Sequence, residues 1–241
     1  GDGSLMSQTP QTYVVDIPDF PTPIRITHPS GGHTNFILVR HGRTEGNVRR
    51  VLVGRSDIPL DTLGERQAEA VGAYLATQHR PDVVISSPLI RAHNTARAIA
   101  ARYGLPISFD DEIMELNFGA YEGFSLEEIT AQDPVFAATF GIVEHDRQWP
   151  EGELLSAFHT RVMSAFLRLA STHIDQTVVV VSHGGVLGSL AAQLLGTHPN
   201  DWVRFQIQNC SVSHVEFGPQ GSVIHCLNEI HHLREVNEAQ P

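Results

Sequence analysis

The sequence predicts an α/β protein: a three-layer α/β/α sandwich whose mostly parallel, twisted sheet is flanked by helices and carries a small helical cap. First, several apolar runs have the length of a strand and no polar alternation, as in "TVVVVS" at 177–182, which is typical of strands covered on both faces. Second, these runs alternate with longer stretches in which apolar residues recur at helical spacing. Strand alternating with helix indicates a parallel sheet between two helical layers.

Two strand–helix pairs are predicted in the first half of the chain. The run "NFILVR" at 35–40 is the first strand, and "LGERQAEAVGAYLATQH" at 63–79 is a helix that ends before a proline. The run "DVVISSP" at 82–88 is the second strand. The helix after it, "LIRAHNTARAIAARYG" at 89–104, ends on a glycine, which commonly follows a helix. Both pairs fit one parallel sheet.

The second half contains the longest predicted helix and the most apolar strand. The helix "ELLSAFHTRVMSAFLRLASTH" spans 153–173, the strand "TVVVVSHGG" spans 177–185, and the helix "GVLGSLAAQLLG" spans 185–196. The runs "SVSHVEF" and "SVIHCLNEI", at 211–217 and 222–230, flank a turn that contains Gly and Pro. They predict a β-hairpin that closes the chain.

Two segments do not follow this alternation. The passage "ELNFGAYEGFSLEEI" at 115–129 predicts a strand, then a loop and helix-prone polar sequence, and we assign residues of about 116–152 to the cap. Residues 1–34 precede the main domain of 35–241. Within them, "GDGSL" looks like a remnant of an expression vector, and the rest, rich in Pro, Thr and Gly, predicts an irregular arm or a short hairpin.

The composition excludes several classes of function. The formal net charge of −11 argues against a nonspecific nucleic-acid binder, which would carry a basic face. All 16 basic residues are arginine, which excludes Schiff-base lysine chemistry and a P-loop lysine. No stretch approaches the ~20 apolar residues of a membrane span, and no secretory signal is recognisable, so we expect a cytoplasmic protein without a membrane partner. Cys210 and Cys226 lie in apolar surroundings that favour buried free thiols over a disulfide.

Chemically capable side chains follow three of the predicted strands. Arg40 and His41 end the first strand, Ser86 and Ser87 end the second, and His183 follows "VVVVS". The alternative is that these strands simply meet solvent, where polar residues cost nothing. In open parallel sheets, however, ligands bind beyond the carboxyl ends of the strands. We therefore expect a site at this edge of the sheet that binds an anion and attacks it.

Four segments carry a resemblance to a known family. They are "RHGRTEGN" at 40–47, "SSPLIRAHNTA" at 86–96, "MELNFGAYEG" at 114–123 and "VVSHGG" at 180–185. In this order they resemble the histidine phosphatase superfamily, whose fold is shared by cofactor-dependent phosphoglycerate mutases and many small phosphatases. The resemblance covers roughly residues 35–233 and implies catalysis through a phosphohistidine, with no cofactor and no metal.

The resemblance gives roles to the strand-end residues. His41 matches the nucleophile, and a neutral imidazole can attack phosphorus because the ordinary pKa of histidine is about 6.5. Arg40 and Arg91 match the arginines that bind phosphate and stabilise the charge on its equatorial oxygens. His183 matches the second histidine, where an imidazolium would complement the dianion. Gly184 lets the backbone approach an anion near a helix N-terminus.

Three further residues complete the site that the resemblance implies. Asn47 is expected to donate to a phosphate oxygen, and Thr44 to do the same. Glu115 matches the acid that protonates the leaving oxygen and later deprotonates water, a role typically worth ~10²–10⁴ in rate. We interpret Glu112 and Glu122 as surface or cap residues and favour Glu115, because it directly precedes the strand-like "LNFG".

Two features depart from the family pattern or extend it. Arg43, Arg49, Arg50 and Arg55 form a basic cluster that would either offset the repulsion of an anionic substrate or be a solvated arginine face. In "PEGELL", Leu154 replaces a serine that is usual in the phosphatase branch. The substrate specificity of that branch therefore does not carry over directly.

Several functions stay open at this point. The motif "ELNFG" and the short cap favour hydrolysis of small-molecule phosphate monoesters over phosphoglycerate mutase-type phosphoryl transfer. A non-catalytic phospho-ligand binder on the same fold is a further alternative. A dinucleotide-binding module is disfavoured because "HGGVLG" lacks the G-x-G-x-x-G spacing, and a metal enzyme because the 14 histidines form no H-E-x-x-H.

The expected partner is a phosphorylated small molecule rather than a nucleic acid. The organic part of the substrate would be recognised by aromatic residues of the cap, although such residues more often belong to the core: Tyr121, Phe124, Phe136, Phe140 and Trp149. The N-terminal arm or the final hairpin could form a homodimer contact.

Overall fold

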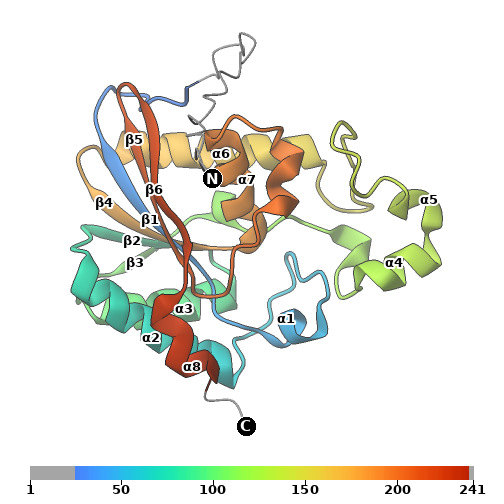
Figure 1. Cartoon of the computed structure of the whole chain (residues 1–241), viewed down its shortest axis with the longest axis horizontal. Coiled ribbons are helices and arrows are strands. Elements are labelled where there is room, and N and C mark those ends of the chain that lie inside the picture. Colours follow the sequence, from blue (N-terminus) through green and yellow to red (C-terminus); the bar gives the residue numbers. More distant parts are fainter. Residues whose placement is uncertain (1–24, 239–241) are drawn as a thin grey trace, which may run out of the picture.

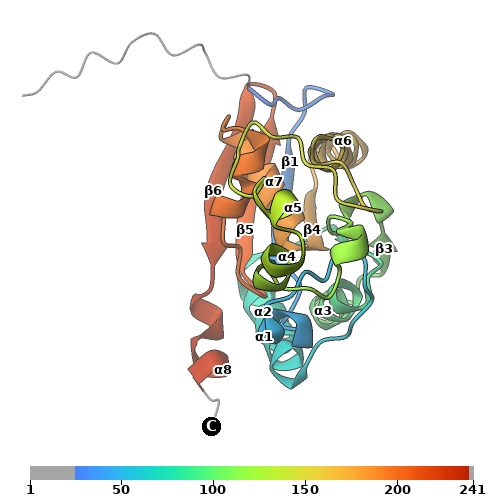
Figure 2. The ribbon, with the colours of Figure 1, turned by 90° about the vertical axis from the view of Figure 1, so that its right-hand side faces the viewer.

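The structure is a computed structural model and is described for residues 25–238, so the expected vector remnant and most of the N-terminal arm lie outside the described residues. These residues form one six-stranded sheet with helices on both faces (Figure 1, Figure 2). The strands are β1 Thr34–Arg40, β2 Val83–Ser86, β3 Ile107–Phe109, β4 Thr177–Ser182, β5 Val212–Gly218 and β6 Gly221–Glu229.

The order of strands across the sheet is β3-β2-β4-β1-β5-β6. β1 pairs in parallel with β4, β4 with β2, and β2 with β3. β5 is antiparallel to β1, and β6 forms the closing hairpin with β5. The predicted mostly parallel sheet and the terminal hairpin are therefore confirmed.

Four long helices cover the sheet, and shorter helices connect its parts. The long ones are α2 Thr62–Gln78, α3 Ile90–Ala101, α6 Leu155–Thr172 and α7 Gly184–Leu194. The shorter ones are α1 Glu45–Arg49, α4 Leu126–Gln132, α5 Pro134–Ala137 and α8 Arg234–Glu238, together with the 3-10 turns η1 Asp111–Ile113, η2 Gly119–Tyr121, η3 Pro199–Arg204 and η4 His231–Leu233. Within residues 25–238, no helix combines the length and the hydropathy needed to cross a membrane.

Successive residues of the central strands face opposite layers. In β1, Phe36 and Leu38 join the core formed with α6 and α7, whereas Ile37 and Val39 join the core formed with α2 and α3. The four consecutive valines of β4 divide in the same way, and all are fully buried. Because side chains alternate across a strand, a strand that is apolar at every position fits only between two covered faces. The α/β/α sandwich is confirmed.

Local polar signals set the starts of the helices. The Asp61 side chain accepts a hydrogen bond from the Gly64 N–H at 2.7 Å and caps α2. Ser125 and Glu128 form a capping box at the start of α4. In Figure 1, α4 and α5 project to one side of the sandwich as a small helical cap.

Two local predictions are wrong. Residues 115–118 form no strand, because side chains rather than a neighbouring strand take up their backbone groups: the Asn117 N–H donates to Glu153 and the Glu115 carbonyl accepts from Arg55. α3 ends at Ala101, three residues earlier than predicted, and Gly104 occupies the turn beyond it with φ of 65°. The edge strand β3, only three residues long, has no counterpart in the sequence prediction.

Candidate active site

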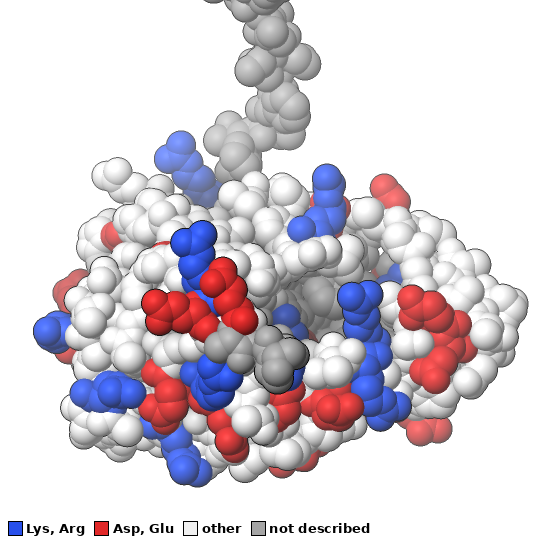
Figure 3. All heavy atoms as spheres, turned by 60° about the horizontal axis from the view of Figure 1, so that its bottom comes forward, with Lys and Arg blue, Asp and Glu red and all other residues white. Residues whose placement is uncertain are grey.

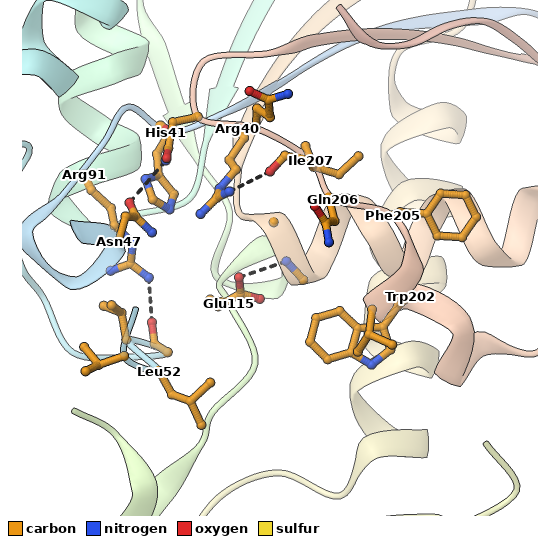
Figure 4. Close-up of a pocket in the computed structure, with 18 of the residues that line it drawn as sticks. Arg40, His41, Asn47, Leu52, Arg91, Glu115, Trp202, Phe205, Gln206 and Ile207 are labelled. Carbon is orange, nitrogen blue, oxygen red and sulfur yellow. Dashed lines mark hydrogen bonds between the residues drawn. The ribbon is translucent and has the colours of Figure 1, made fainter. Parts of the chain in front are cut away.

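The carboxyl ends of the parallel strands open into a cavity of about 520 Å³. β4 lies between β1 and β2 in the sheet, so the residues that follow these strands, His41, His183 and Ser87, are brought together. The cavity is the hollow near the centre of Figure 3, and Figure 4 shows its lining. The predicted site residues that line it are Arg40, His41, Asn47, Arg91, Glu115 and Gly184.

His41 is held in one tautomer. Its Nδ1 lies 2.7 Å from the Gly42 carbonyl oxygen. A carbonyl can only accept, so Nδ1 carries the proton and Nε2 keeps a free lone pair. Burial first, and then the positive charges of Arg91 and Arg40, lower the pKa of His41 well below the ordinary 6.5. The ring is therefore neutral and nucleophilic at neutral pH.

His183 is fully buried beside His41, with their ring centroids 5.2 Å apart, although it does not itself line the cavity. Its Nε2 lies 2.7 Å from the Ser87 hydroxyl, and its Nδ1 has no hydrogen-bond partner. Burial, followed by the charges of Arg91, His41 and Arg40, lowers the pKa of His183 well below 6.5. The protein's own charges thus favour a neutral ring rather than the expected imidazolium, and an anion bound between the arginines would offset them.

The two arginines are held by backbone carbonyls, Arg91 fully buried and Arg40 partly buried. Arg91 is 1% exposed and donates through its terminal nitrogens to the carbonyls of Gly54, at 2.6 Å, and Ser56, at 2.9 Å. Arg40 donates to the Ile207 carbonyl at 2.6 Å. Burial lowers the pKa of Arg91 to about 10 and also lowers that of Arg40. Arg91 therefore remains charged at neutral pH, as arginine side chains in proteins generally do.

No carboxylate of residues 25–238 forms an ion pair with either guanidinium, and the Nε of each is buried without a hydrogen-bond partner. Unpaired buried charges are costly, so such groups are normally matched by an opposite charge. Together with Nδ1 of His183, these atoms leave three unused polar groups around His41. We call Arg40, His41, Arg91 and His183 the basic end of the cavity. Its chemistry suits a phosphate group.

Asn47 and Thr44 have different positions. The Asn47 Oδ1 accepts from the backbone and hydroxyl of Thr44 and from Asn209 Nδ2, which leaves the amide nitrogen to act as donor at the cavity. Thr44 is fully buried, caps α1 and does not line the cavity. Because its hydroxyl is used in the cap, the expected contact between Thr44 and phosphate is not supported.

Glu115 reaches the cavity from the loop before η2. Its Oε1 accepts from the Leu116 N–H at 2.9 Å, and its Oε2 accepts from the Gly185 N–H at 3.0 Å (Figure 4). A Cβ on Gly185 would lie 2.3 Å from Glu115 Oε1, so only glycine leaves room for the carboxylate here. The acid is thereby fixed against the first turn of α7, which also follows His183.

Sequence reasoning missed the residues that hold the Glu115 loop. Arg161 of α6 donates to the carbonyls of Glu112 and Met114 and forms an ion pair with Glu153 at 2.7 Å. Burial raises the pKa of Glu153. Hydrogen bonds from Arg161 and Asn117 and the charge of Arg161 together lower it by more, so the pKa lies below its ordinary value. This glutamate lies in the segment "PEGELL", in which the sequence marks only Leu154 as unusual.

Glu122, interpreted as a surface or cap residue, lies in the predicted cap segment and is half-buried, but it also has a structural role that the sequence did not reveal. Its carboxylate accepts from the backbone N–H groups of Arg55 and Ser56 and from the Ser56 hydroxyl. The same loop supplies the carbonyls of Gly54 and Ser56 that hold Arg91. Glu122 therefore supports the basic end from outside the cavity.

The predicted basic cluster divides into separate positions. Arg43 pairs with Asp61 at 2.7 Å, and Arg55 donates to the Glu115 carbonyl at 2.8 Å. Arg49 and Arg50 are exposed. None of the four lines the cavity.

The cap aromatics do not line the cavity either, so a role in recognising the organic part of the substrate is not supported. They belong to the core or pack against it, which is the interpretation that the sequence favours. Tyr121, Phe124, Phe136, Phe140 and Trp149 pack against one another, with ring centroids 5.1–6.4 Å apart. The side chains beyond the basic end form what we call the apolar wall: Leu52, Phe118, Trp202, Phe205 and Ile207. Phe118 lies in the motif "MELNFGAYEG" and within the predicted cap, whereas no sequence motif marks the other four.

Comparison with known proteins agrees with this geometry. The profile of the histidine phosphatase superfamily (branch 1) matches residues 36–230. An uncharacterised phosphatase PhoE from Bacillus subtilis is 32% identical over 200 residues, which is 83% of this chain and 97% of the relative. A probable phosphoglycerate mutase GpmB from Escherichia coli is 33% identical over 201 residues, covering 81% of this chain and 93% of the relative.

Among solved structures, a phosphoserine phosphatase from Entamoeba histolytica in complex with phosphoserine superposes with a TM-score of 0.76. It is 28% identical and covers 83% of this chain and 99% of its own. The match of the family profile spans the sheet, the cavity and Glu115, well over half of the chain. The protein is therefore a histidine phosphatase of branch 1 of that superfamily.

Proposed function

We propose that the protein hydrolyses phosphate monoesters of small molecules through a phosphohistidine at His41. One observation carries the proposal: the unprotonated Nε2 of His41 is accompanied by the buried, unpartnered Nε atoms of two arginines and by the unpartnered Nδ1 of His183. A phosphate dianion would satisfy these donors and neutralise both cations.

The first half-reaction transfers the phosphoryl group to the enzyme. Arg40, Arg91 and the Asn47 amide hold the phosphate oxygens, and His183 donates through Nδ1 while Ser87 donates to its Nε2. The lone pair on His41 Nε2 attacks phosphorus, the bond from phosphorus to the leaving oxygen breaks, and Glu115 gives that oxygen a proton. The arginines stabilise the charge on the three equatorial oxygens.

The second half-reaction releases inorganic phosphate. Glu115, now ionised, takes a proton from water, the water oxygen attacks phosphorus, and the N–P bond to His41 breaks. Throughout both steps the His41 Nδ1–H donates to the Gly42 carbonyl, which orients the ring and stabilises the positive charge that it gains. Glu115 ends the cycle protonated, ready for the next substrate.

The test is the His41→Ala variant. We expect phosphate release from phenyl phosphate to fall by at least about 10⁴-fold, because no other side chain of the basic end is a free nucleophile. Circular dichroism should show an unchanged fold. Enzyme quenched in acid and alkali during turnover should carry a phosphoryl group that is labile in acid and stable in alkali, as a phosphoramidate is.

Either of two results contradicts the proposal. One is undiminished turnover by His41→Ala, and the other is a trapped phosphoryl group on a residue other than His41. Binding of phenyl phosphate by the wild-type protein without any turnover would instead support a non-catalytic ligand-binding role.

A second function, phosphoglycerate mutase activity, is favoured by the name of the GpmB relative. The two functions differ in the acceptor of the second half-reaction, which is water in one case and a second hydroxyl of the sugar acid in the other. Free phosphate and 2-phosphoglycerate measured together from 3-phosphoglycerate distinguish them. We expect hydrolysis to exceed isomerisation, and a higher rate of isomerisation would overturn this choice.

A further inference from the structure

We propose that the substrates of this phosphatase have an uncharged leaving group with a ring or another apolar face, and that the cavity discriminates against leaving groups that carry a carboxylate. The inference rests on the proposed function, because it assigns the phosphate to the basic end. It names the class of substrate that the remainder of the cavity accepts.

Charge is distributed very unevenly along the cavity. Among its described lining residues, the charged side chains are Arg40, Arg91 and Glu115. All three would be engaged with the phosphate group and the leaving oxygen. The rest of the lining is apolar or carries neutral amides, of which Gln206 is exposed. A carboxylate on the leaving group would therefore have no cation of its own within the cavity.

Two features disfavour a carboxylate on the leaving group: the carboxyl group of Glu115 and the net negative charge of the protein. Glu115 is a carboxyl group at the junction of the basic end and the apolar wall, and the formal net charge of the chain is −11. A carboxylate on the leaving group would lose its water on entering the cavity, and desolvating an unpaired charge is costly. In the proposed mechanism Glu115 becomes a carboxylate as it protonates the leaving oxygen, so a like charge then develops beside the substrate carboxylate and adds to the cost in the transition state.

The aromatic residues of the apolar wall favour a leaving group with a ring or another apolar face. Trp202 and Phe205 follow α7, in and directly after η3, and both are only half-buried. Trp202 meets Phe158 of the core edge to face at 6.3 Å. Figure 4 shows Leu52 on one side of the Glu115 carboxyl and Trp202 on the other. A ring entering between them would cover apolar surface that now faces the cavity.

Gln206 supplies a neutral polar group at the same wall. In the view of Figure 4 its amide lies between Ile207 and Trp202. An amide offers both a donor and an acceptor, which suits a hydroxyl or carbonyl of the leaving group. It supplies no full charge, so it favours neutral polar groups over carboxylates.

The experiment compares two substrates that share the phosphoester linkage. Glycerol 3-phosphate carries a hydroxymethyl group where 3-phosphoglycerate carries a carboxylate. We expect kcat/KM to be about tenfold or more higher for glycerol 3-phosphate, and higher still for phenyl phosphate. All rates should depend on His41, as the His41→Ala variant would show.

Two variants of the wall test the cause. Trp202→Ala should lower kcat/KM for phenyl phosphate about tenfold, and by less for glycerol 3-phosphate, because only the former stacks. Gln206→Arg places a cation on the wall and should raise the ratio of kcat/KM for 3-phosphoglycerate over glycerol 3-phosphate severalfold. Val135→Arg on α5, where the side chain is 82% exposed and far from the lining, adds the same charge and should leave the ratio unchanged.

The outcomes separate the two levels of inference. Equal kcat/KM for the matched pair, with His41-dependent turnover, overturns the substrate class and leaves the phosphatase function intact. The same holds if Gln206→Arg and Val135→Arg change the ratio equally. Absence of phosphate release from all three substrates overturns the proposed function itself.

Discussion

Three of the four residues of the basic end lie at the ends of sheet strands and the fourth, Arg91, lies in the first turn of α3, whereas the residues of the apolar wall lie in loops and single turns. Arg40, His41 and His183 directly follow or end β1 and β4, whose backbones are fixed by neighbours on both sides. Leu52 lies in the loop after α1, and Trp202 lies in η3. The difference suggests a division of labour, in which the sheet fixes the chemistry and the connections select the substrate.

The first prediction tests whether the basic end acts on every substrate alike. Arg91→Lys keeps the charge but removes the guanidinium fork that joins the Gly54 and Ser56 carbonyls to the phosphate site. We expect kcat/KM to fall about 10³-fold for phenyl phosphate and glycerol 3-phosphate equally. Arg97→Lys, an exposed position on the same helix, is the control and should change neither.

If Arg91→Lys lowered kcat/KM for only one of the two substrates, Arg91 would contribute to recognition of the leaving group. Phosphate binding and substrate selection would then not be separated between the basic end and the apolar wall. Steady-state phosphate release is sufficient for the measurement, with circular dichroism to establish that both variants fold.

The second prediction concerns Glu115, which lies between the two regions. Glu115→Gln should lower kcat/KM for glycerol 3-phosphate about 10²-fold, because its alkoxide needs a proton to leave. The loss should be much smaller for 4-nitrophenyl phosphate, whose phenolate leaves without one. Glu112→Gln, an exposed carboxylate three residues earlier, should behave as the wild type.

Equal losses for the alkyl and aryl substrates would mean that Glu115 positions the phosphate rather than protonating the leaving oxygen. The comparison of the two leaving groups thus reports the chemistry of the acid directly.

The third prediction concerns support from outside the cavity. Arg161→Gln removes the ion pair with Glu153 and the hydrogen bonds to the Glu112 and Met114 carbonyls, so the Glu115 loop loses its main anchor. We expect kcat to fall about tenfold with little change in KM, and the free energy of unfolding to fall by about 2 kcal/mol. Urea denaturation and steady-state kinetics measure the two effects.

Arg102→Gln is the matched control, because Arg102 forms an exposed ion pair with Glu69 on another face of the molecule. Exposed pairs contribute little, so both its kcat and its stability should resemble the wild type. Equal effects in the two variants would contradict a specific role for Arg161.

The smallest expected effect is on stability in mild acid. The pKa of His183 is lowered well below 6.5 in the folded state, so below about pH 6.5 the unfolded chain gains a proton that the folded chain does not. Lowering the pH from about 7 to 6 should therefore reduce the free energy of unfolding by roughly 0.7 kcal/mol through this residue. Well above pH 6.5 the ring is neutral in both states, and its contribution to the pH dependence vanishes.

Urea denaturation at both pH values checks this sign. His183→Gln should show a smaller loss on acidification than the wild type, whereas Trp202→Phe at the apolar wall should show the same loss. A steeper loss in His183→Gln would contradict a neutral His183.

The same contrast explains what the sequence could and could not predict. β4 contains four consecutive valines, and a strand that is apolar at every position is stable only in the middle of a sheet covered on both faces. The position of His183 at the end of this strand could therefore be predicted. β3 is short and half-exposed, and residues 115–118 owe their shape to side chains from distant segments. Neither the formation of β3 nor the shape of residues 115–118 can therefore be predicted from the residues of the segment alone.

The residues of the site also differ in how far the sequence could predict them. His41, Arg40 and Arg91 carry recognisable motifs at the ends of elements. Trp202 is an aromatic residue in a short turn, and Arg161 is one arginine on an amphipathic helix, so neither differs locally from an ordinary surface or core residue. Only the tertiary structure brings Trp202 to the apolar wall and Arg161 beneath the Glu115 loop.

The bond from the Gly185 amide to the Glu115 carboxyl has a spectroscopic use. Because the acceptor of this N–H is the same oxygen pair that would release and regain a proton in every turnover, the amide proton of Gly185 should shift in frequency with the ionisation of the carboxyl group. A single backbone resonance, assigned by nitrogen-15 labelling, would then follow the acid through a titration without any substrate or any change to the chain.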